Sequence, residues 1–167
     1  MANVSDLVNA YEGRDFARPN LFKVIIPFLG GDFEFRCKAA SEPPTNNGTV
    51  EVSYLNRKIK IPGDPTFEPW TVTVYNDDEQ NIRERILEWN SLVNAQGDSI
   101  TSSNVGDVKK EATVQRLNRQ LEVVKEHTVA GIWPQNVAEI ELDWENNDQV
   151  EQFAVTFEID YHQRSNG

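Results

Sequence analysis

The sequence predicts a mainly β fold, an antiparallel β-sandwich or barrel with one main α-helix packed against it. Several short segments alternate large apolar and polar residues, which is the two-residue period of a strand with one buried face. One longer segment instead repeats its apolar residues at helical spacing. Clusters of Gly, Pro and Asn separate the segments, as is typical of strands joined by turns. A length of 167 residues fits one domain, 1–167.

The N-terminal part predicts a short helix followed by a β-hairpin. Apolar residues in 4–12 recur at helical spacing. Residues 21–27 are rich in β-branched side chains, Gly30-Gly31 is a turn signal, and 32–38 alternates as the return strand. Phe33, Phe35 and Cys37 would then share the buried face of that return strand.

The next part predicts a loop and three strands. Residues 41–49 have loop composition, and an extended segment follows with Val50, Val52 and Tyr54 on one face. A short strand around 59–61 leads into a turn at 62–65, where the sequence is PGDP. The run WTVTVY, within 69–75, is then a half-buried strand.

The strand at 69–75 is expected to lead into the main helix. Asp77 and Gln80 have the spacing of a capping box, so the helix is predicted over 77–93. It would pack on the sandwich through one apolar stripe at i, i+4, i+7 and i+11. The stripe consists of Ile82, Ile86, Trp89 and Val93. Residues 97–107 are predicted to form a polar surface loop.

The C-terminal part returns to β structure. Short β-like runs begin at 108, and Pro134 is expected to end the second of them. Residues 137–144 and 152–161 then predict the two strands of a hairpin. Three residues of the first strand would point inward: Ile140, Leu142 and Trp144. Five residues of the second would do so: Phe153, Val155, Phe157, Ile159 and Tyr161. The last residues, 162–167, are expected to fray.

Composition limits the function classes. Lys and Arg number 16 against 27 Asp and Glu, a formal net charge of −11, which opposes nucleic-acid binding unless a local basic patch exists. One cysteine allows no intrachain disulfide. The N-terminus has no secretory pattern, and no apolar run is long enough to span a bilayer. We therefore expect a soluble, acidic domain of intracellular type with no membrane anchor.

No residue pattern predicts a catalytic, cofactor or metal site. His127 and His162 have no His or Cys neighbour at ligand spacing, so a zinc site is not expected. Cys37 falls on an apolar face and fits a small buried hydrophobe better than a nucleophile. The acidic run that begins at Asp77 fits a helix cap better than an acid–base pair. A protein with large β surfaces and no site is typically a structural or interaction protein.

Five segments, in order and nearly end to end, resemble the tail tube protein of contractile-tailed bacteriophages. They are RDFARPNLFKV (14–24), FRCKA (35–39), NRKIKIPGDPTFEPWTVTVYNDDE (56–79), GIWPQNV (131–137) and ELDWENNDQVEQFAVTFEIDY (141–161). The chain departs from the family pattern in the 41–50 loop and in the tail after Tyr161.

The resemblance implies a structural protein of the virion, assembled in the host cytoplasm. It implies hexameric rings of the chain itself, stacked into a hollow inner tube through which double-stranded DNA passes without specific binding. The implied partners are the tail sheath protein, baseplate tube-initiating proteins, a tape-measure protein and a tail terminator. No cofactor is implied.

The acidic face of the predicted C-terminal hairpin suggests which residues line the lumen. Carboxylates alternate with the inward residues of both strands, and a wall of like charge would let DNA slide without sticking. We therefore expect one of two groups of carboxylates to face the channel. The first is Glu158 with Asp160, and the second is Glu139, Glu141 and Asp143. A solvated outer face is the competing interpretation.

Three other functions remain as alternatives. An inner tube of a type VI secretion-like or bacteriocin injection system would share the fold. A small-ligand-binding β-barrel would need an inward pocket with polar anchors, whereas the strand faces are filled by aromatic residues. A two-carboxylate glycosidase would need acids in apolar surroundings on neighbouring strands, and no such pair is found.

Overall fold

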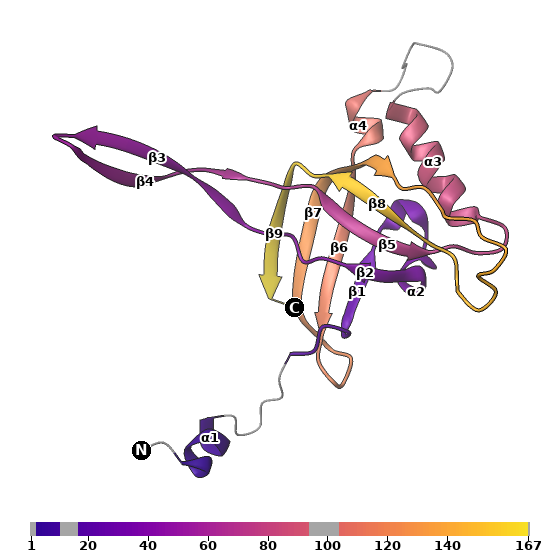
Figure 1. Cartoon of the computed structure of the whole chain (residues 1–167), viewed down its shortest axis with the longest axis horizontal. Helices are drawn as coiled ribbons and strands as arrows, with labels where there is room; N and C mark the ends of the chain where they lie inside the picture. The colour runs from indigo at the N-terminus through magenta and orange to yellow at the C-terminus, as the bar shows by residue number, and fades with distance from the viewer. Residues whose placement is uncertain (1–2, 11–16, 94–103, 167) are drawn as a thin grey trace.

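The structure is a computed structural model, and it describes residues 3–10, 17–93 and 104–166. Two antiparallel β layers face each other across the core, and a long two-stranded arm projects from one side (Figure 1). A helix, α3 (Asn81–Val93), lies along one end of the layers, and α1 (Val4–Ala10) stands away from them. The predicted mainly β fold with a flanking helix is therefore confirmed.

One strand joins the two layers. The first part of β7 (Val123–Val137) pairs with β6 (Lys110–Leu117) and β9 (Tyr161–Asn166), and its last residues pair with β8 (Gln152–Glu158). The layers therefore run β1-β6-β7-β9 and β7-β8-β5-β2. The remaining strands in this order are β1 (Phe22–Ile25), β2 (Cys37–Ala40) and β5 (Trp70–Tyr75).

The core forms where the alternating faces of both layers meet. Trp70, Val72 and Val74 of β5 are fully buried, and they pair directly with the buried odd positions of β8. The prediction of a half-buried strand at 69–75 is thus confirmed, as is the inward face of β8. The predicted strand 152–161 is interrupted after Glu158, so Tyr161 begins β9 and is half exposed.

The predicted helix stripe is confirmed in its main part. Ile82, Ile86 and Trp89 are buried, whereas Val93 is only half-buried at the helix end. The predicted capping box is wrong, because α3 begins at Asn81 and the Gln80 carbonyl accepts the first helical hydrogen bond, from Glu84 N. Gln80 itself has a φ of 56°, so the chain turns sharply before the helix.

The predicted return strand 32–38 is wrong for 32–36, and only Cys37 and Lys38 lie in a strand, β2, which pairs with β5 and not with β1. After β1 the chain forms a 3₁₀ turn, η1 (Pro27–Leu29), and then the short helix α2 (Phe33–Arg36). Helical spacing sends Phe33 into the core and leaves Phe35 81 % exposed. Burial of Phe33 together with Leu29 outweighs the local alternation, which would have placed both phenylalanines on one face.

Two predicted strand breaks lie inside strands. Pro134 does not end β7, which continues to Val137 through a bulge between Pro134 and Asn136. The predicted turn 62–65 lies within β4 (Arg57–Thr66), whose one partner among the described strands is β3 (Asn46–Tyr54). Prolines are tolerated there because the other edge of β4 needs no hydrogen-bond donors.

Two expectations at loops and ends change, and a third, the N-terminal helix, is confirmed over the residues that the structure describes. Residues 162–166 are not frayed, since β9 pairs with β7 along its length. Of the predicted loop 97–107, residues 97–103 lie outside the described part and Val105–Val108 form α4. Helix α1 covers 4–10 of the predicted 4–12, and residues 11 and 12 lie outside the described part.

The predicted strand 137–144 is wrong beyond Val137. Residues 138–151 form an irregular connection between β7 and β8. Of the three residues expected inward, only Ile140 packs against the core, whereas Leu142 is 87 % and Trp144 98 % exposed. The alternation is real, but no strand in the described part of the chain covers its apolar face.

Candidate assembly interface

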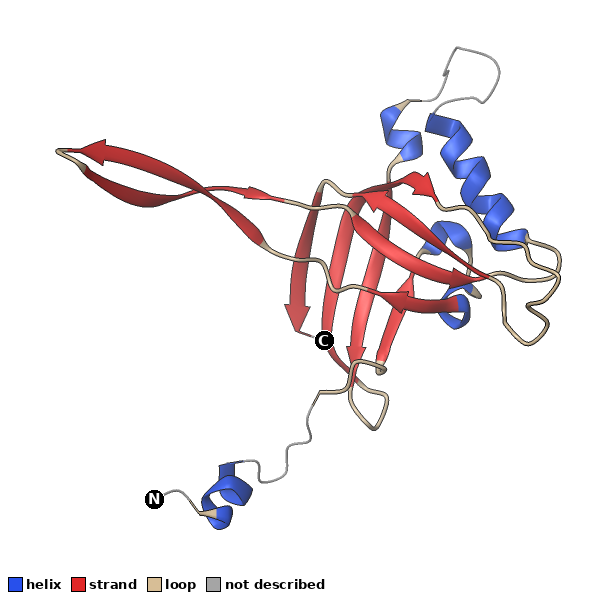
Figure 2. Ribbon diagram, in the orientation of Figure 1, coloured by secondary structure: helices blue, strands red, loops and turns tan. Residues whose placement is uncertain are grey.

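The projecting arm is a β-hairpin made of β3 and β4 (Figure 2). Its chain reverses at Leu55 and Asn56, whose φ values of 44° and 62° are both left-handed, as a tight two-residue hairpin turn requires. Farther down, the two strands cross closely at Gly48 and Gly63. A Cβ added at Gly63 would lie 3.0 Å from the carbonyl carbon of Gly48, so a side chain at this crossing would force the strands apart.

The two faces of the arm differ in chemistry. Residues paired across the strands share a face, so Val50 opposite Ile61 and Val52 opposite Ile59 form an apolar face. The other face carries Glu51 opposite Lys60, together with the Lys58–Glu51 ion pair at 3.2 Å. All four apolar side chains are exposed. A two-stranded hairpin with an open apolar face is marginal in water, so the arm is built to be covered by another surface.

The first link at the root of the arm, residues 41–45, is held against the sandwich through Glu42 and Pro44. His127 is only 2 % exposed, and its Nε2 lies 2.5 Å from Glu42 Oε1. His162 Nε2 lies 3.1 Å from the Pro44 carbonyl oxygen. Trp70 Nε1 also donates to the Ser41 carbonyl at 2.7 Å.

The second link, residues 67–69, connects the arm to β5, and His162 of the sandwich contacts this link as well. The ring of His162 lies 5.4 Å from that of Phe67, edge-on, and 6.2 Å from that of His127. His127 therefore contacts the first link, and His162 contacts both links. The pair fixes where the arm leaves the sandwich.

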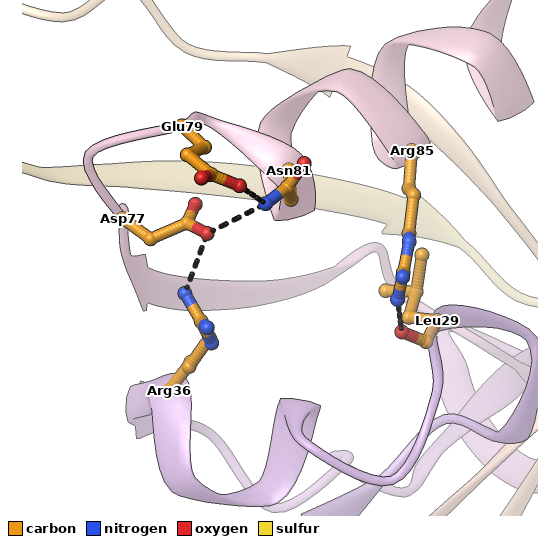
Figure 3. Close-up of polar contacts among 6 residues, drawn as sticks. All are labelled: Leu29, Arg36, Asp77, Glu79, Asn81 and Arg85. Carbon is orange, nitrogen blue, oxygen red and sulfur yellow. Dashed lines mark hydrogen bonds and ion pairs between the residues drawn. The ribbon is translucent and has the colours of Figure 1, made fainter.

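A polar cluster joins the start of α3 to the segment between β1 and β2 (Figure 3). Arg36 of α2 pairs with Asp77 at 3.1 Å, and Asn81 Nδ2 donates to Asp77 at 3.2 Å and to Glu79 at 2.9 Å. Arg85 Nη1 donates to the Leu29 carbonyl oxygen at 2.8 Å. The acidic run thus anchors α2 and the turn before α3, and it does not cap the helix as predicted.

Two groups in this region have shifted pKa values. Partial burial by itself would raise the pKa of the Asp77 carboxyl, but hydrogen bonds from its own backbone and Asn81, with the Arg36 cation, together lower it below its ordinary 3.8. Burial raises the pKa of the Cys37 thiol to about 12, and a hydrogen bond with the Ala39 backbone, a smaller effect, acts in the opposite direction. A thiol held neutral in this way is a packing group and a poor nucleophile.

The five carboxylates proposed for the lumen do not share one face. Glu139, Glu141 and Asp143 are exposed on the irregular connection after β7. Glu158 ends β8 opposite Trp133, and Asp160 follows it and pairs with Lys109 at 2.7 Å. The shared strand face behind this prediction is therefore wrong, and the lumen assignment itself stays a prediction.

The described residues hold neither a metal cluster nor a membrane-spanning helix. No group of three or more His, Cys, Asp or Glu side chains there could hold a metal ion. No helix in the same residues is long and apolar enough to cross a membrane. The feature that sequence reasoning missed is the arm. Its signal was the alternation on both sides of Leu55-Asn56, with apolar residues at matching distances from that turn.

A small β-sandwich that projects a long, apolar and uncovered arm has the architecture of a structural subunit completed by contact with another molecule. Comparison with known proteins identifies the family to which this structural subunit belongs. The chain belongs to the phage tail tube protein family, whose model matches residues 14–165. It is 43 % identical over 159 residues to the tail tube protein gp19 of Enterobacteria phage T4, covering 95 % of this chain and 98 % of that one.

Solved structures show the same fold at low sequence identity. The tube-terminating cap of the anti-feeding prophage aligns over 100 % of both chains with a TM-score of 0.69 and 19 % identity. A chain of the sheath–tube complex of an extracellular contractile injection system, PVC, aligns over 100 % of both chains with a TM-score of 0.65 and 16 % identity. The predictions of a tail tube family member, and of a structural protein that is no enzyme, are confirmed.

Proposed function

We propose that this chain assembles into hexameric rings that stack into the hollow inner tube of a phage tail, and that DNA passes through that tube on infection. The observation that carries the proposal is the β3–β4 arm, whose exposed apolar face needs a partner surface. The likeness to the T4 tail tube protein over nearly the whole chain supports a tube as the product of that contact.

The proposed partners follow the same reasoning. The relatives include a chain in a sheath–tube complex and a tube-terminating cap, which supports contacts of this chain with a sheath and a terminator. Baseplate initiators and a tape-measure protein complete the proposed set, with assembly in the host cytoplasm. A secretion-type tube is the weaker alternative, because those relatives share the fold at 16–19 % identity whereas the phage protein shares 43 %.

A matched pair of arm variants tests the proposal. Val52→Ser with Ile59→Ser removes one directly opposed pair from the apolar face. Glu51→Ser with Lys60→Ser removes the neighbouring pair from the charged face and serves as the control. We expect sedimentation and negative-stain images to show rings or tubes for the wild type and the control, and dispersed subunits for the apolar-face variant. Tubes formed equally well by all three proteins would refute the role of the arm.

We further infer that Glu158 and, two residues on, Asp160 face the channel, and that the charge of Glu158 repels DNA from the wall. Glu158 is the better probe because Asp160 is neutralised by Lys109. Virions with Glu158→Lys should assemble normally and eject DNA more slowly, whereas Glu88→Lys, on the exposed side of α3, should leave ejection unchanged. An assembled-tube structure that places Glu158 on the outer surface would contradict this assignment.

A further inference from the structure

The connection 138–151, here called the acidic loop, is an unusual surface for an isolated subunit. It carries six carboxylates and no Lys or Arg, so it supplies −6 of the chain's −11. Among the described residues none of the six makes an ion pair. At its centre, Leu142 and Trp144 are almost fully exposed. An exposed tryptophan flanked by unpaired acids has the composition of a binding element that lacks its partner.

A cleft of complementary chemistry opens at the β6–β7 turn, and we call it the basic cleft. Its volume is about 630 Å³, within the usual range of binding pockets. Four cations line it, Arg18, Arg116, Arg119 and Lys125, beside the apolar side chains of Leu21 and Val124. The one acid in the lining, Glu42, is already engaged by His127.

Two of these cations are arranged in a way that calls for an anion. Arg116 and Lys125 stand directly opposite each other on β6 and β7. Val114 and His127, the next opposed pair on the same face of the two strands, are buried in the core. Arg116 and Lys125 therefore lie at the edge of the core, where the space between the two layers meets solvent.

Like charges directly opposed across strands are destabilising. No carboxylate among the described residues pairs with either Arg116 or Lys125, and Arg116 Nη2 donates a hydrogen bond to the Arg18 carbonyl oxygen at 3.3 Å. A carboxylate supplied from outside would relieve this repulsion.

We propose that the acidic loop of one copy of this chain docks in the basic cleft of a neighbouring copy. Trp144 fills the apolar part of the cleft, and the carboxylates beside it neutralise Arg116 and Lys125. The acidic loop is the β7–β8 connection, and the basic cleft is at the β6–β7 turn. That connection and that turn lie on different sides of the sandwich (Figure 1). A contact between two different patches of identical subunits is head-to-tail, and it closes into a ring or continues as a helical stack.

This inference rests on the proposed function, because both require self-association, but it concerns a contact separate from the arm. The proposed contact requires one negative and one positive surface. Reversing either surface should break the contact, and reversing both should restore it. Because the attraction is partly between exposed charges, rising salt should weaken it.

Charge reversal in assembly is the first test. Glu141→Lys with Asp143→Lys, and separately Arg116→Glu with Lys125→Glu, should each prevent tubes, while the chain carrying all four changes should form them again. The control, Glu84→Lys with Glu88→Lys on exposed α3, makes the same change in net charge as the loop variant and should assemble. Wild-type and reversed chains that all assemble alike would overturn the inference and leave the proposed function intact. Loop variants that form tubes but fail to bind sheath would assign the loop to the sheath and also overturn it.

A binding test works without assembly. A labelled peptide of residues 138–151 is titrated into the full chain carrying Val52→Ser and Ile59→Ser, with fluorescence anisotropy as the readout. A second chain also carries Arg116→Gln and Lys125→Gln, substitutions that remove both positive charges without placing two carboxylates opposite each other. We expect this chain to bind the peptide about tenfold more weakly or worse. Thermal melts check that both chains are folded. Absence of peptide binding, or equal binding to both chains, would refute the docking even if tubes form.

Discussion

Replacing Trp89 tests whether α3 belongs to the core of the subunit or to an interface. Its side chain is 0 % exposed, and its ring centroid lies 5.1 Å from that of Phe28 and 5.6 Å from that of Phe157. Its Nε1 donates to the Val108 carbonyl oxygen at 2.7 Å, which ties α3 to α4. Truncating a buried tryptophan to alanine costs about 3–5 kcal/mol, and the carbonyl left without its donor adds about 1 kcal/mol.

That sum is comparable to the whole unfolding free energy of a marginally stable domain, about 5–15 kcal/mol. We therefore expect Trp89→Ala to lower the urea midpoint severely or to prevent folding. Trp89→Phe keeps a ring but loses the hydrogen bond, so it should lose less stability. Trp144→Ala is the matched control, because the same substitution at a 98 % exposed site should change the unfolding free energy by less than about 0.5 kcal/mol.

The measurement is urea unfolding of chains that also carry Val52→Ser and Ile59→Ser, so that assembly does not add to the apparent stability. The slope against urea should stay the same in Trp89→Phe and Trp144→Ala if only stability changes. An unchanged midpoint for Trp89→Ala would refute the reasoning, since it would mean that the indole is not part of the folded core.

Two further predictions follow from shifted pKa values. Because the pKa of Cys37 is raised to about 12 from 9.0, its thiol should react slowly with alkylating reagents at pH 8 in the folded chain and readily after unfolding. The folded state holds this proton more tightly, so the contribution of Cys37 to stability is present below pH 9 and is lost as the pH rises toward 12; rapid labelling of folded protein would contradict this. The lowered pKa of Asp77 has the opposite sign, so its contribution is present above about pH 3.8 and is lost as the pH falls through its folded-state pKa. Asp77→Asn should reduce stability at pH 7 and flatten the acid side of the stability profile, and a profile parallel to that of the wild type would show that ionisation of Asp77 contributes nothing to stability.

The sequence by itself determined those elements in which the spacing of the apolar residues matches the face that is buried in the structure. Strand β5, the alternation of β8 and the α3 stripe of Ile82, Ile86 and Trp89 could be predicted because each repeats its apolar residues at the spacing of its own structure. The five segments within 14–161 that resemble tail tube proteins, taken in their order along the chain, also identified the family. Both kinds of signal are local or sequential, so neither needs a contact between distant residues.

Only the tertiary structure decided which apolar faces find a partner within the chain. The patterns at 50–61 and at 137–144 alternate as well as that of β8 does, yet the first forms an uncovered arm and the second an irregular loop with Trp144 in solvent. Periodicity states that a face is apolar, but it does not state whether the covering surface lies in the same chain or in another copy. The opposed cations Arg116 and Lys125 depend on strand register in the same way. The candidate interfaces were therefore beyond the reach of sequence reasoning, because they are defined by contacts that the isolated subunit leaves unmade.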